Sequence, residues 1–304
     1  MHTVLGQRNP IFPRSFPRAR VLPSVNAPRP LKHVYPWEDM TVCIAAITLV
    51  PSGDPKIVFC LDMKAATDLG SAETSYKLIR LPTRFWVLMA GPLSEAREIG
   101  ATIGEALKIR TPSTLPEMIQ DLRDALGIHR KAMADAHTKA TLGIAYEEFR
   151  KKGKSAWPED LHRRVSWDIH NHPASVELIV LGFFPNGNPA LVKISANRVW
   201  ACDTFAVIGS GTPIAESALF QRSLDIHDAP ENTIYHVYEA KRLAENEPNV
   251  GKRTIMMVLK RGKPGELVTE TGFKFLARQF AKFGPQRFKA SALPVDMFEA
   301  LKTL

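Results

Sequence analysis

The sequence predicts an α+β fold, a four-layer α-β-β-α sandwich in which two antiparallel sheets lie between two helical layers. First, Thr41 opens a pair of apolar, strand-length segments joined by a turn that contains proline and glycine, which is typical of a β-hairpin. Second, the segments after this pair run in the order strands, two helices, strands, two helices and one strand. This order suits the sandwich because each sheet then buries one face on the other sheet and one face on helices.

Strand-length apolar segments recur along the chain. Those expected to form strands cover residues 41–50, 56–61, 77–81, 85–90, 176–184, 190–194, 205–208 and 254–260. The first two segments are joined by the turn at residues 51–55, and the fifth and sixth by a loop that contains Asn186-Gly187. Since Asn-Gly is a strong signal for a tight turn, a second hairpin is expected there.

Helical spacing of apolar residues alternates with these strands. The expected helices cover residues 94–107, about 113–149, 213–225 and 231–246. The second of them begins near Ser113 or Thr114, either of which can cap a helix. Residues 150–172 are polar and are expected to form a surface excursion.

Three regions differ in composition. Residues 1–40 form an extension that is rich in proline and arginine, without helical or strand periodicity, which predicts disorder. They lack the apolar core and cleavage site of a secretory signal. Two interpretations are open: a propeptide that is removed, or a start assigned too far upstream with Met40 as the initiator, and the second is favoured. Residues 41–265 form the folded domain, and residues 266–304 a helical C-terminal extension.

The overall composition indicates a soluble globular protein, with 45% hydrophobic and 23% charged residues. No apolar run is long enough to cross a membrane, so a membrane partner is not expected. A cytoplasmic location is expected. The three cysteines form no paired motif, so neither a disulfide framework nor a zinc site is expected. Residues 1–40 hold six Lys/Arg against two acids and so carry +4 of the net charge of +9. The +5 of the remaining residues is modest, so nucleic-acid binding is not expected.

Four short motifs follow one another in a characteristic order. They are Met40-Thr-Val-Cys-Ile-Ala45, Val58-Phe-Cys-Leu-Asp-Met-Lys-Ala-Ala-Thr67, Tyr76-Lys-Leu-Ile-Arg80, and Val87-Leu-Met-Ala-Gly91 with Glu95 after it. In order and spacing they resemble the β subunits of proteasomes, which are N-terminal-nucleophile (Ntn) hydrolases. The first motif looks especially like the start of the bacterial ancestral β-subunit (Anbu) proteins. A fifth motif, Val207-Ile-Gly-Ser-Gly-Thr-Pro213, is similar to the family's glycine-serine-glycine turn, so the resemblance spans residues 41–260.

The resemblance implies a threonine-type peptidase. Thr41 would be the nucleophile once it is the first residue, because an α-amine with a pKa of about 8 is neutral often enough to take the hydroxyl proton. Lys77 would lower the pKa of the hydroxyl by its charge, and Asp62 would hold Lys77 in place. The Gly91 N–H would form the oxyanion hole, and Ser210 would assist proton movement near the amine.

Each of these residues also has an ordinary structural interpretation. Thr41 would then start a strand, and the others would be a turn acid at Asp62, a solvated lysine at Lys77, a turn glycine at Gly91 and a helix cap at Ser210.

The chain departs from the family at two points. The family's Asp-x-x-Ser-Gly segment reads Glu247-Pro-Asn-Val-Gly251, so Val250 replaces the serine, and the acid is either lengthened or shifted to Glu245. Met40 precedes the threonine where self-processing precursors carry glycine, which favours removal by an aminopeptidase over autolysis. If the residues before Thr41 were retained, its amine would stay in a peptide bond, and the chain would be a non-catalytic structural subunit.

Other sites are less well supported. His170-Asn-His172, with Asp168 and His162 nearby, is a possible metal site in what looks like a polar loop. Gly209-Ser-Gly211 lacks the rest of a dinucleotide fingerprint. Cys43 faces the same side as Thr41 but has no visible base of its own.

The resemblance further implies certain partners. A peptide or protein substrate and a homo-oligomer are expected, and an unfoldase ATPase is a possible partner. No metal or organic cofactor is expected. An amidohydrolase of the same fold that acts on small amides is the other enzymatic interpretation.

Overall fold

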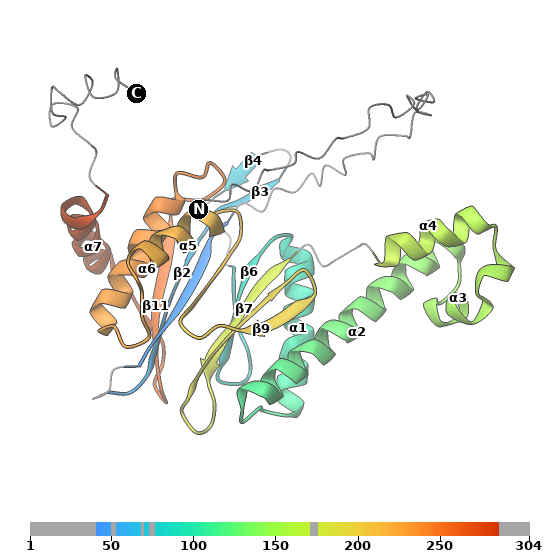
Figure 1. Ribbon diagram of the computed structural model, residues 1–304, viewed down its shortest axis with the longest axis horizontal. Coiled ribbons are helices and arrows are strands. Elements are labelled where there is room, and N and C mark those ends of the chain that lie inside the picture. The colour runs from blue at the N-terminus through green and yellow to red at the C-terminus, as the bar shows by residue number, and fades with distance from the viewer. Residues whose placement is uncertain (1–40, 50–52, 68–69, 73–76, 171–175, 286–304) are drawn as a thin grey trace, which may run out of the picture. The chain divides into compact units, whose positions relative to one another are not determined.

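The computed structural model describes residues 41–49, 53–67, 70–72, 77–170 and 176–285. Over these residues the chain is a mixed α+β protein built on two five-stranded antiparallel sheets, as Figure 1 shows. The predicted turn at residues 51–55, the Tyr76 end of the third motif and His172 fall wholly or partly outside the described residues. So do residues 1–40.

The first sheet holds the predicted N-terminal hairpin. Its strand order is β10-β1-β2-β11-β12, and the strands are β1 (Cys43–Thr48), β2 (Lys56–Asp62), β10 (Phe205–Ile208), β11 (Thr254–Lys260) and β12 (Glu266–Leu267). Cys43 lies opposite Leu61 on one side and Ile208 on the other, which confirms the hairpin and places β1 between β2 and β10. β1 is shorter than expected, because Thr41 and Val42 precede the ladder.

The second sheet is a simple meander in the order β5-β6-β7-β8-β9. Its strands are β5 (Leu78–Arg80), β6 (Phe85–Ala90), β7 (Glu177–Phe183), β8 (Pro189–Ser195) and β9 (Arg198–Ala201). The hairpin around Asn186-Gly187 is confirmed by the pairing of β7 with β8. Strand β9 was not predicted; the signal for it was Ala196-Asn197, where both residues are left-handed and form a tight turn. β3 (Ala65–Thr67) and β4 (Gly70–Ala72) pair as a separate short ribbon.

The helices differ from expectation in the middle of the chain. They are α1 (Leu93–Ile109), α2 (Leu115–Leu142), α3 (Tyr146–Lys152), the short 3₁₀ helix η1 (Lys154–Ala156), α4 (Glu159–His170), α5 (Thr212–Gln221), α6 (Pro230–Ala244) and α7 (Glu270–Phe283). The helical region expected to reach Phe149 breaks at Gly143, which ends α2 in the left-handed conformation. The segment expected to be a polar loop contains α4, a helix of mostly polar residues of which only Val165 is buried.

Three buried clusters of apolar side chains lie between successive layers of the described residues. One joins the second sheet to α1 and α2, one lies between the two sheets, and one joins the first sheet to α5, α6 and α7. The layers therefore run helix, sheet, sheet, helix, as Figure 1 shows. Leu276 of α7, in the predicted C-terminal extension, belongs to the third cluster. Among the described residues no helix has both the length and the apolar character that crossing a membrane needs.

Candidate active site

The carboxylate of Asp62 is the centre of a buried polar cluster at the end of β2. Asp62 is fully buried, and its Oδ1 accepts hydrogen bonds from the Val42 N–H at 3.0 Å and from the Lys77 ammonium at 3.0 Å. Its Oδ2 accepts from the N–H groups of Lys64 at 3.2 Å and Gly251 at 2.9 Å. A buried carboxylate is stable only when its oxygens are bonded in this way. The structure thus supplies a fixed negative charge inside the protein.

Thr41 and Lys77 meet at the same oxygen of this carboxylate. The Thr41 hydroxyl donates to Asp62 Oδ1, the atom that also accepts from Lys77 Nζ. Thr41 precedes the first sheet and Lys77 precedes β5 of the second, so the ion pair of Lys77 with Asp62 connects the two sheets. Both residues are almost fully buried, Thr41 at 1% and Lys77 at 3% exposure. The arrangement places the Thr41 hydroxyl beside the ion pair of the Asp62 carboxylate and the Lys77 ammonium.

Ser210 holds the main chain of Thr41. It lies in the turn between β10 and α5, and its Oγ accepts from the Thr41 N–H at 3.4 Å and donates to the Thr41 carbonyl at 3.3 Å. The N–H of Gly211 donates to the same carbonyl at 3.2 Å. Gly209 has a φ of 93°, and a Cβ there would lie 2.5 Å from Thr41 Cγ2, so only glycine allows this close approach.

Gly91 reaches this region through strand β6. It follows Ala90, the last residue of that strand, with a φ of 96° in the left-handed region. Two residues earlier, the Met89 carbonyl accepts a hydrogen bond from the Cys43 thiol at 3.5 Å, and Cys43 lies two residues after Thr41. The packing of the two sheets on each other therefore brings the predicted oxyanion residue into the same part of the molecule as the cluster.

The Cys43 thiol is buried beneath the cluster. Burial raises its pKa to about 12, with the charge of Lys77 opposing this rise in part. At neutral pH the sulfur is therefore a neutral thiol. This argues against Cys43 as the nucleophile, because the thiolate is the reactive form.

Three main-chain groups of the cluster were not predicted from the sequence. They are the N–H group of Val42, which bonds Asp62 Oδ1, and those of Lys64 and Gly251, which bond Asp62 Oδ2. A Cβ on Gly251 would lie 2.5 Å from Lys64 Cβ and 2.9 Å from Asp62 Oδ2, so glycine is required by the close approach. The signal in the sequence was Gly251, the glycine that ends the segment 247–251.

The residues around that glycine have roles of their own. Val250 is 5% exposed and belongs to the apolar cluster behind the first sheet. Glu245 pairs with Lys241 and Arg242, and the Glu247 side chain accepts from Asn249 at 3.4 Å. Glu245 thus contacts residues at the end of its own helix, and Glu247 contacts a residue of its own loop.

Glu177 also supports the site and was not predicted. At the start of β7, its Oε2 accepts from the Gly209 N–H at 2.8 Å and its Oε1 from the Ser195 hydroxyl at 2.7 Å. It therefore connects the second sheet to the turn that carries Ser210.

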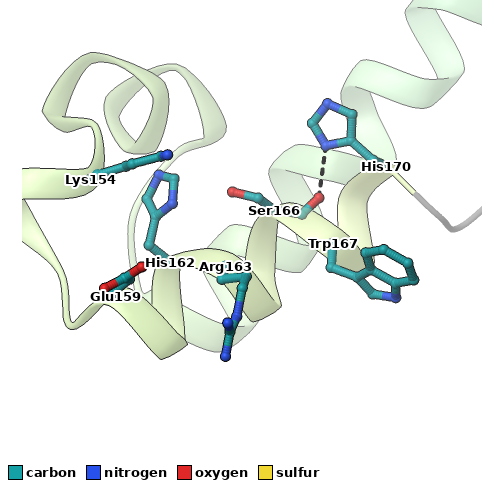
Figure 2. Close-up of a pocket in the computed structure, with 7 residues that line it drawn as sticks. All are labelled: Lys154, Glu159, His162, Arg163, Ser166, Trp167 and His170. Carbon is teal, nitrogen blue, oxygen red and sulfur yellow. Dashed lines mark hydrogen bonds between the residues drawn. The ribbon is translucent and has the colours of Figure 1, made fainter. Parts of the chain in front are cut away.

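A separate pocket of about 370 Å³ lies on the region formed by η1 and α4 (Figure 2). It is lined by Lys154, Glu159, His162, Arg163, Ser166, Trp167 and His170. Figure 2 shows that these side chains do not converge on one point: Lys154 and His162 lie together, whereas Arg163 and Trp167 point elsewhere.

The possible metal site falls in this region and is not assembled by the described residues. His170 Nδ1 lies 2.7 Å from the Ser166 carbonyl, His162 stacks on Phe149, and Asp168 lies 3.7 Å from His137 Nε2. Within the described ranges, no group of three or more histidine, cysteine, aspartate or glutamate side chains is arranged to hold a metal ion. His172 lies outside these ranges.

No protein-family model matches the chain, and no curated protein matches it either.

Proposed function

We propose that the chain is an Ntn hydrolase with a proteasome-like fold, which cleaves peptide bonds with Thr41 after the residues before it have been removed. The observation that carries the proposal is the sharing of Asp62 Oδ1 by the Thr41 hydroxyl and the Lys77 ammonium. A nucleophilic hydroxyl, a cation beside it and an acid that orients both are what activation of a threonine requires. The two antiparallel sheets between helical layers and the order of the sequence motifs support the same assignment.

Thr41 would perform the reaction as follows. The free α-amine takes the hydroxyl proton, and the oxygen attacks the carbonyl carbon of a peptide bond. The N–H of Gly91 stabilises the oxyanion that develops. The carbon–nitrogen bond breaks, the departing amine takes the proton, and an ester on Thr41 remains. Water, deprotonated by the same amine, hydrolyses that ester and restores the hydroxyl.

The full chain is expected to be an inactive precursor. The Thr41 nitrogen is then an amide, which is not basic, and the Thr41 side chain is 1% exposed. Ser210, which already contacts this nitrogen at 3.4 Å, would keep the freed amine in place. Peptides or proteins are the proposed substrates, and a homo-oligomer served by an unfoldase ATPase is the proposed assembly.

The test compares the full chain with a protein whose first residue is Thr41. Each is incubated with a peptide electrophile that reacts with hydroxyl groups, and intact masses are measured. We expect one adduct on the shortened protein, none on the full chain, and none on the shortened Thr41→Ala variant. Peptide cleavage should be seen only with the protein that forms the adduct, and should be lost in the shortened Thr41→Ala variant.

The matched control for this test is Thr48→Ala. Thr48 lies at the other end of β1, is 1% exposed, and donates through Oγ1 to the Asp228 carbonyl at 2.7 Å. Loss of its buried hydroxyl should lower stability but leave the adduct. A folded shortened protein that forms no adduct would contradict the proposal.

A non-catalytic structural subunit is the second candidate. The burial of Thr41 in the full chain favours it, because a covered hydroxyl is useless as a nucleophile. Natural protein that retains the residues before Thr41 and never reacts would support this function. Adducts with small amides but not with peptides would instead indicate an amidohydrolase.

A further inference from the structure

Lys241 of α6 is a fully buried lysine. Its ammonium group donates to three acceptors, which match the three protons that it carries. One is the carboxylate of Glu245, one turn further along the helix. The other two are the successive main-chain carbonyls of Gly251, at 2.8 Å, and Lys252, at 3.0 Å. The ammonium thus holds the loop between α6 and β11 at two adjacent points.

This loop is the one that reaches Asp62. The peptide unit on the other side of Gly251 donates its N–H to Asp62 Oδ2 at 2.9 Å. Oδ1 of the same carboxylate holds the Thr41 hydroxyl and the Lys77 ammonium. A chain of hydrogen bonds therefore runs from Lys241 through Gly251 to Asp62, and ends at the proposed nucleophile.

A buried lysine is not needed to fill this space. Burying an ion pair costs desolvation, and apolar residues of similar size often serve stability equally well. What methionine or leucine cannot supply is a directed bond to two neighbouring carbonyls. Lys241 therefore serves to fix the position of the loop between α6 and β11.

We propose that Lys241 is a positioning residue of the Thr41 site, which orients the Gly251 N–H toward Asp62 and thereby fixes the carboxylate that aligns Thr41 and Lys77. The catalytic part of this inference rests on the proposed function. Its structural part, the placement of the Gly251 N–H, does not.

The variant that tests the proposal is Lys241→Met, which keeps the length of the side chain and removes its three donors. Glu245 retains a partner in this variant, because Arg242 Nη1 lies 2.7 Å from its Oε2. If Lys241→Met does not fold, Lys241→Met/Glu245→Gln removes both charges together and takes its place.

The matched control is Arg222→Met. Arg222 of the α5 end also pairs with a buried carboxylate of α6, Glu239, and donates to a main-chain carbonyl, that of Phe283, at 2.8 Å. The variant Arg222→Met therefore removes comparable bonds, but the contacts of Arg222 do not lead to Asp62.

The first measurement is independent of catalysis. Amide hydrogen exchange of Gly251 is followed by NMR in the full chain. In Lys241→Met we expect exchange at this amide to rise about tenfold or more above the change at other slow amides, and no such local rise in Arg222→Met. Unchanged local protection of Gly251 in a folded variant overturns the proposal.

The second measurement is the rate of electrophile labelling as a function of pH, on proteins that begin at Thr41. We expect Lys241→Met to react about 10- to 100-fold more slowly per folded molecule and to show a shifted pH profile. Arg222→Met should keep the profile of the parent. A profile identical to the parent in Lys241→Met overturns the catalytic part.

The two measurements separate the two claims. If the parent protein that begins at Thr41 is never labelled, the proposed function fails, and the exchange of Gly251 alone decides whether Lys241 positions the loop.

Discussion

The cluster around Asp62 and the pocket on α4 both contain titratable side chains, but only in the cluster are these side chains buried and directed at one group. Around Asp62, groups that are far apart in sequence converge on one carboxylate and are buried. On η1 and α4, titratable groups between Lys154 and His170 line an open pocket and point in different directions (Figure 2). The difference shows that neighbourhood in sequence does not make a chemical site. A chemical site forms where donors and acceptors converge in a water-poor interior, because each interaction is strengthened there.

The largest effect is expected from breaking the Asp62 cluster. Asp62→Asn removes the charge beside the buried Lys77 ammonium and turns one accepting oxygen into a donor. We expect the free energy of unfolding to fall by about 3–5 kcal/mol, measured by urea denaturation. The double variant Asp62→Asn/Lys77→Met should lose less than the sum of the single changes.

An exposed acid provides the comparison for this change. Glu105 is 70% exposed and lies 3.9 Å from Lys108. Glu105→Gln should change the free energy of unfolding by less than about 0.5 kcal/mol. A similarly small effect of Asp62→Asn would show that the cluster is not a stabilising centre.

A smaller effect is expected from crowding the same cluster. In Gly251→Ala the new methyl group would lie 2.5 Å from Lys64 Cβ and 2.9 Å from Asp62 Oδ2. We expect a loss of about 1–3 kcal/mol in urea denaturation, because backbone and carboxylate have to shift.

Gly127→Ala is the matched control for this crowding. Gly127 lies inside α2, and a Cβ there meets nothing within 4 Å. Alanine should raise stability by about 0.5–1 kcal/mol, since it favours the helix. Equal effects of the two substitutions would argue against the close approach at Gly251.

The buried thiol gives a pH-dependent prediction. Burial raises the pKa of Cys43 from 9.0 to about 12 and also raises the pKa of Cys60. Above about pH 9 the unfolded chain therefore loses thiol protons that the folded chain keeps, so stability falls as pH rises toward 12. Each thiol contributes a slope of at most about 1.4 kcal/mol per pH unit.

Urea denaturation between about pH 8.5 and 10 measures this slope. Cys43→Ala should make it shallower. Cys202→Ala should change it less, because that thiol is only partly buried and its pKa rises less. An unchanged slope in Cys43→Ala would mean that the thiol is exposed to water.

The smallest effect is expected on α4. Trp167 lines the pocket but is 65% exposed. Trp167→Ala should change the free energy of unfolding by about 0.5 kcal/mol or less and leave the labelling of Thr41 unchanged. A large loss of labelling would connect the two regions and remove the contrast between them.

The contrast also marks how far the sequence could predict the site. Thr41, Asp62, Lys77 and Gly91 stand at the ends of strands, so the apolar pattern that predicts the strands also places these residues at their ends. Gly251 ends the segment 247–251, which marks it in the sequence, but its bond to Asp62 depends on how the loop packs. Lys241 lies on a helix, and its own neighbours in sequence give no sign of Asp62. Strand β9 was missed because a strand of four residues carries little periodicity. Helix α4 was missed because it is mostly polar and buries only Val165.

The sequence by itself determined the strand and helix layers, because the period of apolar residues selects the local structure and the face that is buried. It also contains the residue types that the proposed activation of Thr41 needs. Only the tertiary structure decided that Lys77 and Thr41 share one oxygen of Asp62, and that α6 lies where Lys241 reaches Gly251. Those contacts depend on how separate elements pack, and directional hydrogen bonds form only after packing has fixed their positions.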